Sequence, residues 1–212
     1  MRRLPAALVS QIYAAAEPIA DNGLDQTKID DIAAATGVPK ATLYYYFTGK
    51  EEILAFLLAE MLSLMEGRVA VAAAGVGTAR DRLAAVVEAQ FSVMFDHPAV
   101  FRALIGELGR AGRLPGIVVA IRGAFHVPVE HLLREGEADG SLRHLDDPAA
   151  ASSAVFGAVT LNALQHLLER DQADPNAVAA ATLDVLITGL RATERGRSHR
   201  GRPTTRRTKT GA

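Results

Sequence analysis

The stretch that decides the fold runs from Thr27 to Lys50 and reads TKIDDIAAATGVPKATLYYYFTGK. On either side of Gly37, apolar residues are spaced three and four apart, which places them on one face of a helix. Gly37 suits the left-handed conformation that ends many helices, and Pro39 suits the first turn of the next helix. Thr27 is placed as the N-cap of the first helix. The stretch therefore predicts a helix-turn-helix, with a recognition helix over 39–46.

The outward face of the recognition helix carries groups that suit a DNA backbone. A lysine such as Lys40 can neutralise a phosphate, and the hydroxyls of Thr42, Tyr44 and Tyr45 can donate to phosphate oxygens. Lys50 stands at a helix start, where a cation is unfavourable for the helix dipole unless an anion also binds there. The alternative is a helical hairpin whose tyrosines only pack within a core.

A longer series of residues surrounds this motif: Ile12–Ala15, Gly23, Thr27, Asp31–Ala33, Gly37–Val38, Thr42–Tyr44, Phe47 and Lys50. In this order they resemble the tetracycline-repressor (TetR) family of transcriptional regulators. The resemblance is dense over about the first sixty residues, and the rest of the chain agrees in helical character and length. It implies an all-α homodimer of about nine helices per chain, with an N-terminal three-helix helix-turn-helix domain and a C-terminal helical domain that binds a ligand and dimerises.

The resemblance also implies domain boundaries and DNA contacts. The DNA-binding domain is expected at 1–50, the ligand-binding and dimerisation domain at 51–194, and a fourth helix over 50–74 should link the two. Several positions that commonly touch DNA in the family are occupied by suitable residues here. The expected DNA-binding residues are Thr27, Lys40, Ala41, Thr42, Tyr44, Tyr45 and Lys50.

Composition narrows the class of protein. The 212 residues are 49% hydrophobic and 22% charged, which is enough for a substantial core. Segments rich in Ala, Leu, Glu and Arg favour helix, and no alternating β-branched run predicts a sheet. The absence of Cys excludes disulfides and thiolate metal sites and fits a reducing cytoplasm. No apolar run reaches the length of a membrane span, and the N-terminal segment lacks the apolar centre of a signal peptide.

The net charge of −1 hides an asymmetry. The segment after Glu194 holds seven cations and no acid, so the rest of the chain has 16 basic and 24 acidic residues. DNA binding must therefore depend on where single groups are placed rather than on bulk charge. The tail over 195–212 is expected to be disordered, and it either holds DNA phosphates loosely or is a simple solvated end.

Two prolines and a set of aromatic residues mark the remaining helices. Pro18 should kink the last turn of a first helix over 5–22, and Pro128 should bend a seventh helix over 115–137. In the family, the helices expected here over 78–95, 98–110 and 115–137 surround the ligand. Few charged residues interrupt them and no cationic cluster indicates a phosphorylated effector, so the expected effector is small and largely apolar. Its candidate contacts, which ordinary core packing would also explain, are Phe91, Met94, Phe95, Phe101, Leu104, Phe125 and His126.

The last two expected helices, over 148–170 and 175–193, have small residues at helical spacing, which permits helices to cross closely. They form either a hairpin within one core or, as the resemblance implies, half of a two-fold four-helix dimer interface. The expected interface residues are Ala154, Gly157, Ala158, Leu161, Leu164, Val178, Ala181, Thr182, Val185, Leu186 and Gly189.

Motifs of catalysis and metal binding are missing from the sequence. There is no HExxH, no thiolate ligand, no Gly-rich phosphate loop and no nucleophile elbow, so we expect no metal, no cofactor and no enzymatic activity. The sequence predicts a ligand-responsive DNA-binding regulator, most often a repressor in such a family, that binds a palindromic operator as a homodimer. A helical protein-interaction module and a small helical enzyme are the alternatives.

Overall fold

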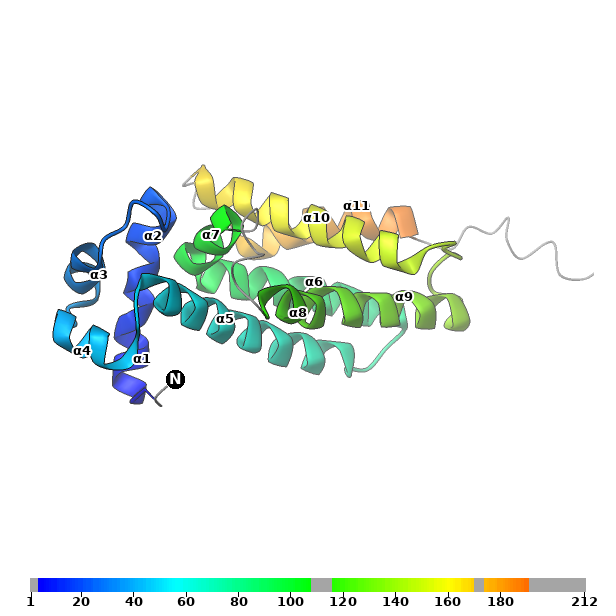
Figure 1. Ribbon diagram of the computed structural model, residues 1–212. Coiled ribbons are helices and arrows are strands. Elements are labelled where there is room, and N and C mark those ends of the chain that lie inside the picture. Colours follow the sequence, from blue (N-terminus) through cyan, green and yellow to red (C-terminus); the bar gives the residue numbers. More distant parts are fainter. Residues whose placement is uncertain (1–3, 108–115, 170–173, 191–212) are drawn as a thin grey trace, which may run out of the picture.

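The computed structural model describes residues 4–107, 116–169 and 174–190 (Figure 1). Within these ranges the chain forms helices and no strand, which confirms the predicted all-α class. The predicted ends of the sixth, eighth and ninth helices and the tail over 195–212 lie outside the described residues. The elements are α1 (Ala6–Ile12), η1 (Tyr13–Ala15), α2 (Ala16–Asn22), α3 (Ile29–Thr36), α4 (Lys40–Tyr46), α5 (Lys50–Ala73), α6 (Ala79–Asp96), α7 (Pro98–Glu107), α8 (Ile117–Ile121), η3 (Arg122–His126), α9 (Val127–Asp139), α10 (Pro148–Leu168) and α11 (Pro175–Leu190).

The two interior prolines act one turn earlier than their own positions. Helix geometry tightens to a 3-10 turn at Tyr13–Ala15, upstream of Pro18, and widens to a π-turn at Arg122–His126, upstream of Pro128. A proline ring collides with the carbonyl four residues before it and lacks the N–H that would bond there. The prediction that Pro18 redirects the last turn is therefore wrong, because α2 continues regularly to Asn22.

The N-terminal helices gather at one end of the molecule, at the left in Figure 1. Helix α3 contacts η1, α2 and α4, and the buried side chains of this small core include Ile12, Ile32, Leu43 and Phe47. Helix α5 begins at this end and runs along the larger C-terminal group of helices. It buries residues at both ends, which ties the two groups of helices together.

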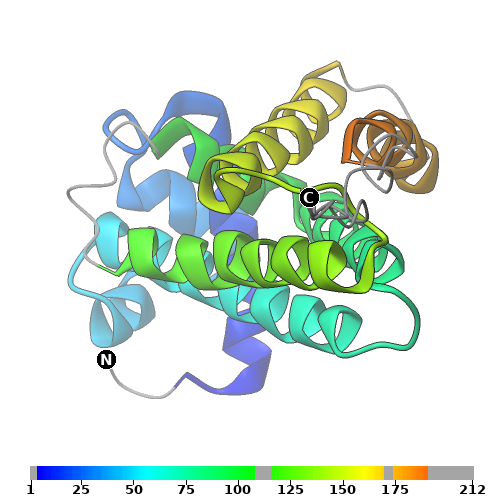
Figure 2. The same cartoon turned by 90° about the vertical axis from the view of Figure 1, so that its right-hand side faces the viewer.

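Helix α6 is the centre of the C-terminal group. It contacts α5, α9, α10 and α11, and Figures 1 and 2 show α10 and α11 on one side of it, with α5 and α9 on the other. Its buried side chains include Val86, Val87, Phe91 and Met94. Burying each large apolar side chain stabilises the folded state by about 1.5–3 kcal/mol relative to leaving it exposed. Helix α6 therefore contributes much of the hydrophobic stabilisation of the C-terminal group.

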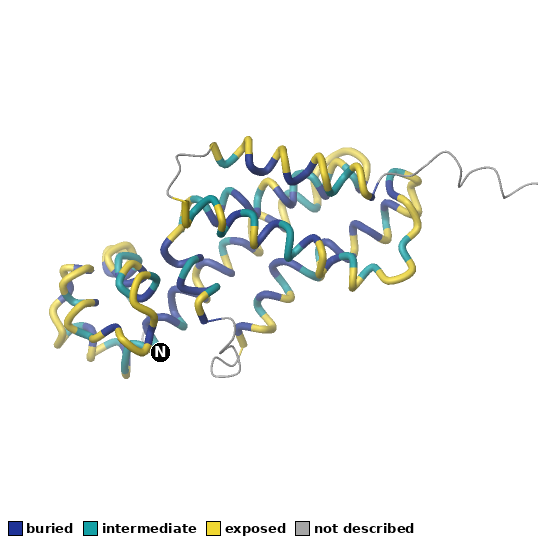
Figure 3. The backbone as a smooth tube through the Cα atoms, turned by 90° about the horizontal axis from the view of Figure 1, so that it is seen from above, coloured by how far each residue is buried: buried dark blue, intermediate teal, exposed yellow. Residues whose placement is uncertain are grey.

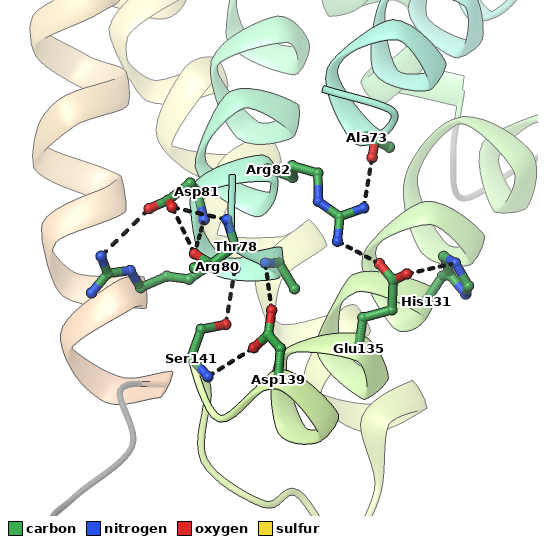
Figure 4. A network of polar contacts seen from close by, with 10 residues as sticks. Ala73, Thr78, Arg80, Asp81, Arg82, His131, Glu135, Asp139 and Ser141 are labelled. Carbon is green, nitrogen blue, oxygen red and sulfur yellow. Dashed lines mark hydrogen bonds and ion pairs between the residues drawn. The ribbon is translucent and has the colours of Figure 1, made fainter. Parts of the chain in front are cut away.

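A polar network joins the start of α6 to the end of α9, far from α4 in Figure 1, and Figure 4 shows it from close by. The carboxylate of Asp139, at the end of α9, accepts hydrogen bonds from the backbone N–H of Ala79 (2.9 Å) and of Ser141 (2.8 Å). These bonds satisfy a free N–H in the first turn of α6 and hold the pKa of Asp139 below its ordinary value. Arg82 bridges from α6 to Glu135 of α9 (2.9 Å) and to the carbonyl of Ala73 (3.1 Å). None of the described helices is both long and apolar enough to cross a membrane.

Candidate nucleic-acid interface and regulatory core

The turn between α3 and α4 has the geometry that the sequence predicts. Gly37 adopts φ 66° and ψ 12°, a left-handed conformation that strains any residue with a side chain. The buried hydroxyl of Thr36 donates to the carbonyl of Ile32 (2.8 Å) and accepts from the N–H of Val38 (3.2 Å). These bonds fix the direction in which α4 leaves the turn.

Helix α4 presents two tyrosines to solvent. Tyr44 is 59% exposed and Tyr45 is 60% exposed, whereas Leu43 on the opposite face is buried. Lys40 and Ala41 are also exposed and Thr42 is half-buried, and Figure 3 shows exposed and buried residues interspersed along the N-terminal helices. Five of the seven predicted DNA-binding residues therefore share α4, in the arrangement that a major-groove helix requires.

Two of the three lysines in the stretch 27–50 have side-chain partners within the chain. Lys40 forms an ion pair with Asp30 at the start of α3. The ammonium of Lys50 donates to the backbone carbonyls of Asp25 (3.0 Å) and Thr27 (2.9 Å), so it fastens the loop before α3 to the start of α5. An ammonium has three N–H donors, and these two bonds use two of them.

The structure corrects both predictions for Thr27. Helix α3 begins at Ile29 with Lys28 as its N-cap, and Asp31 accepts from the Lys28 N–H (2.8 Å), so Thr27 is not the cap. The Thr27 side chain is fully buried, and its hydroxyl lies 2.9 Å from both the Pro18 and the Gly23 carbonyl oxygens. Its hydroxyl is therefore used within the domain, and we leave Thr27 out of the DNA interface.

One arginine joins the two groups of helices. Arg102 of α7 binds Asp21 (2.8 Å) and Glu17 (2.9 Å) of α2 with separate guanidinium nitrogens. Beside it, the rings of Tyr13 and His97 lie 5.1 Å apart. The single positive charge of Arg102 offsets part of the negative charge of Glu17 and Asp21, and the two ion pairs connect α7 directly to α2.

The predicted effector residues lie in the core of the C-terminal group. Phe91, Met94, Phe101, Leu104 and Phe125 are buried, and Phe95 is half-buried with its ring 6.3 Å from that of Phe91. They come from α6, α7 and η3, all of which contact α10. The structure thus brings helices α6 to α10 together around an apolar interior, in which these residues pack as part of the core.

The π-turn places His126 against α10. Its ring lies 5.0 Å from the ring of Phe156, and its Nδ1 lies 3.3 Å from the hydroxyl of Ser152. The Ser152 hydroxyl also donates to the His126 carbonyl (3.2 Å). His126 therefore has a polar partner within the chain. This is the arrangement of an ordinary buried histidine and does not require a ligand.

The expected dimer residues divide into an outer and an inner group. Ala154, Leu161, Ala181, Val185 and Gly189 are exposed, and Leu161 and Val185 are 64% and 72% exposed. Gly157, Ala158, Leu164 and Leu186 are half-buried. Val178 and Thr182 lie on the buried face of α11, and the Thr182 hydroxyl accepts a hydrogen bond from the side-chain amide of Asn162 (2.6 Å). We therefore remove these two residues from the expected dimer interface.

Three residues with notable roles were missed by sequence reasoning. Lys28 is an exposed cation at the start of α3, and its position at a helix-turn-helix N-terminus was the signal for it. Arg102 gave no signal, because its partners lie 81 and 85 positions away. Gln90 of α6 is 1% exposed, and only the structure shows that a polar residue faces the core there. Across the described ranges, no group of three His, Cys, Asp or Glu side chains could hold a metal ion.

Family models match both parts of the chain. Residues 12–56 match the model described as bacterial regulatory proteins, tetR family, and residues 76–163 match the tetracyclin repressor-like C-terminal domain. The two matches together cover more than half of the sequence. The chain belongs to the TetR family of transcriptional regulators, and it is a regulator rather than an enzyme.

Individual relatives agree with this membership. The chain is 28% identical over 181 residues to the fatty acid metabolism regulator protein of Bacillus subtilis (strain 168), covering 84% of this chain and 93% of the relative. It is similar to the crystal structure of FadR from Bacillus subtilis in complex with stearoyl-CoA, with a TM-score of 0.70, 25% identity, and coverage of 86% and 99%. It shares its fold with the ketosteroid regulator KstR2 of Mycobacterium tuberculosis, with a TM-score of 0.74, 19% identity, and coverage of 89% and 97%.

Proposed function

We propose that this protein is a homodimeric repressor that binds a palindromic operator and releases it when a long-chain acyl thioester binds. In this proposal, residues 1–50 bind DNA and residues 51–194 bind the effector and dimerise. The observation that carries it is the exposed face of α4, where Tyr44 and Tyr45 stand in solvent on a helix whose opposite side is buried. The Tyr45 ring packs edge-to-face against that of Tyr46 at 4.9 Å, and both Tyr44 and Tyr45 still leave more than half of their surface in solvent, where it suits contact with DNA.

Helix α4 is too short to read an operator alone. Its seven residues span about 10 Å, enough for a few base pairs in one major groove. Two copies related by a two-fold axis would read a palindrome if their recognition helices lay about 34–36 Å apart. The exposed residues of α10 and α11, Leu161 and Val185 among them, provide the apolar face that such a pairing needs.

The effector class rests on the core and on the relatives. The apolar interior around Phe91, Met94 and Phe125 suits an aliphatic chain. The crystal structure of FadR from Bacillus subtilis, which this chain resembles, is a complex with stearoyl-CoA, and that molecule joins such a chain to a phosphorylated group. We therefore replace the expected unphosphorylated effector with a long-chain acyl-CoA, whose apolar chain would lie in the core and whose phosphorylated headgroup would remain outside it. A regulator of this kind acts on DNA in the cytoplasm.

The proposal is tested by selecting bound duplexes from a random library with the full-length protein. The expected result is a palindromic consensus bound by two chains, followed by release of that duplex in fluorescence anisotropy when stearoyl-CoA is added. Lauric acid and a steroid serve as control ligands. Recovery of no duplex would overturn the DNA-binding assignment, and a palindrome that stearoyl-CoA leaves bound would overturn the effector class alone.

A further inference from the structure

Two buried polar side chains in the C-terminal core have no hydrogen-bond partner among the described residues. Gln90 of α6 is 1% exposed, and both its amide nitrogen and its amide oxygen are unpaired. Thr160 of α10 is 4% exposed, and its hydroxyl is unpaired. Leaving such groups unpaired away from water costs free energy, so an unpaired amide in a core calls for an explanation.

Thr160 differs from the other buried helical threonines of this chain. Thr36 and Thr182 each donate to the carbonyl four residues earlier, at 2.8 Å, which is how a helical hydroxyl satisfies itself in a core. Thr160 makes no such bond. Its hydroxyl is therefore free to serve a partner that the helix itself does not supply.

The surroundings of these two groups indicate what that partner is. Gln90 precedes Phe91 and lies one turn from Met94, both predicted effector residues, and α6 contacts α10. The charged side chains that are buried in the described ranges are Glu107 and Glu130, both acids. A buried carboxylate ligand would need a cation beside it, so a neutral group with hydrogen-bonding capacity fits this core better.

We propose that Gln90 and Thr160 are the polar anchors of an acyl thioester bound in this core. The Gln90 Nε2 donates to the thioester carbonyl, and the Thr160 hydroxyl supplies a second donor to that oxygen. The Gln90 Oε1 accepts from the nearest amide N–H of the pantetheine arm, so all three unpaired atoms gain partners. This inference rests on the proposed effector class. It adds the two residues by which the protein would recognise the carbonyl of an acyl chain, which an alkyl chain lacks.

The test uses two ligands that differ at one group. Stearoyl-CoA and its octadecyl thioether analogue, which lacks the carbonyl, are titrated calorimetrically into the full-length protein. The wild type is expected to bind stearoyl-CoA about tenfold more tightly, the effect of one good buried hydrogen bond. Gln90→Leu and Thr160→Val should each bring the two affinities to within about twofold. Thr160→Val should leave binding of the thioether unchanged, whereas Gln90→Leu should weaken it, because both ligands lose the bond to the pantetheine amide. Gln165→Leu, an exposed glutamine on α10, is the control and should keep the preference.

Each outcome separates the inference from the function on which it rests. Equal affinities in the wild type, or an undiminished preference in both variants, would overturn the anchors and leave the effector class standing. Failure of the wild type to bind either ligand would overturn the effector class and the anchors with it.

Thermal unfolding of the ligand-free protein is a second, independent test of Gln90. Gln90→Leu should raise Tm, since it removes an unpaired amide, and a fall in Tm would show that Gln90 is an ordinary structural residue.

Discussion

Tyr44 is largely exposed, so removing its hydroxyl tests the DNA interface without disturbing the core. Tyr44→Phe is expected to weaken operator binding about fivefold, because a neutral hydrogen bond contributes about 1 kcal/mol. Fluorescence anisotropy with the selected duplex measures the loss, and Tm should stay unchanged. Tyr13→Phe, which lies outside α4, is the control. Equal losses in the two variants would show that α4 is not the recognition helix.

Lys50 has two possible roles that salt dependence separates. Lys50→Met removes the bonds to the Asp25 and Thr27 carbonyls, and charged hydrogen bonds of this kind contribute about 1.5–3 kcal/mol, less at a partly exposed site. We expect a lower Tm and weaker operator binding. If Lys50 also meets a phosphate, the slope of log affinity against log salt should fall by about one. Arg122→Met, which removes an exposed cation from η3 in the C-terminal group, is the control for lost charge.

The single-residue predictions succeeded where a local rule governs them. Gly37 and the exposure of Tyr44 follow from helix geometry over a few positions. Thr27 failed because its hydroxyl finds the Pro18 and Gly23 carbonyls, which become neighbours only when the loop closes. The odd position of Lys50 had the same cause, since its partners lie 23 and 25 positions away.

Among the helices, the contact between α7 and α2 is the route by which the core can act on the DNA-binding domain. Arg102→Gln should reduce the factor by which stearoyl-CoA weakens operator binding, because the two groups of helices then move more independently. Anisotropy titrations with and without ligand give this factor. Arg68→Gln, which breaks a pair with Asp96 within the C-terminal group, is the matched control.

The same substitution also exposes two acids near the DNA, and a double variant separates this effect from coupling. Glu17→Gln with Asp21→Asn removes the pairs while it removes the negative charges. It should strengthen operator binding and still lose coupling. If Arg102→Gln and the double variant both respond to ligand like the wild type, α7 does not transmit the signal through this contact.

The helix boundaries show where local rules end. The starts of α5, α6, α10 and α11 agree with the sequence to within one residue, because Gly, Thr, Asp and Pro act on their own turns. The sequence predicted a distortion from each proline. It placed that of Pro18 in the last turn of the helix, where α2 is regular, and gave no position for that of Pro128. A proline strains the turn before it, and neighbouring helices decide whether that turn tightens, as at η1, or widens, as at η3.

For the molecule as a whole, stability should depend on pH in two separate windows. Backbone and side-chain hydrogen bonds from Ala79 and Ser141 hold the pKa of Asp139 below its ordinary value near 3.8. Its contribution is present above that value and is lost as pH falls through the lowered pKa. Hydrogen bonding and charge attraction to Glu137 raise the pKa of His144 above 6.5, so its contribution is full below 6.5 and is lost as pH rises through the raised pKa.

Thermal unfolding as a function of pH measures both effects. The difference in Tm between wild type and Asp139→Asn should shrink as pH is lowered below about 3.8, the ordinary pKa of an aspartate. The difference for His144→Asn should shrink as pH is raised above about 6.5. Differences that stay constant across these windows would show that neither group is linked to folding. Both sites are exposed, so high salt should weaken both effects.

Pairing of two chains through α10 and α11 is tested at the exposed apolar residues. Leu161→Glu with Val185→Glu should convert a dimer to a monomer in sedimentation and abolish binding to the palindrome, since a buried unpaired carboxylate is strongly unfavourable. Val71→Glu, equally exposed but on α5, should leave both unchanged. A double variant that remains dimeric and binds DNA would place the interface elsewhere.

The sequence by itself determined the all-α class, the helix-turn-helix and the family, because these depend on spacing and turn residues within a few dozen positions. Only the tertiary structure decided which residues of those helices are available for function. Burial removed Thr27, Val178 and Thr182 from surfaces, and packing left Gln90 in the core without a partner. The reason is that solvent exposure and hydrogen-bond pairing are properties of neighbours, and the neighbours of Arg102 or Gln90 come from distant parts of the chain.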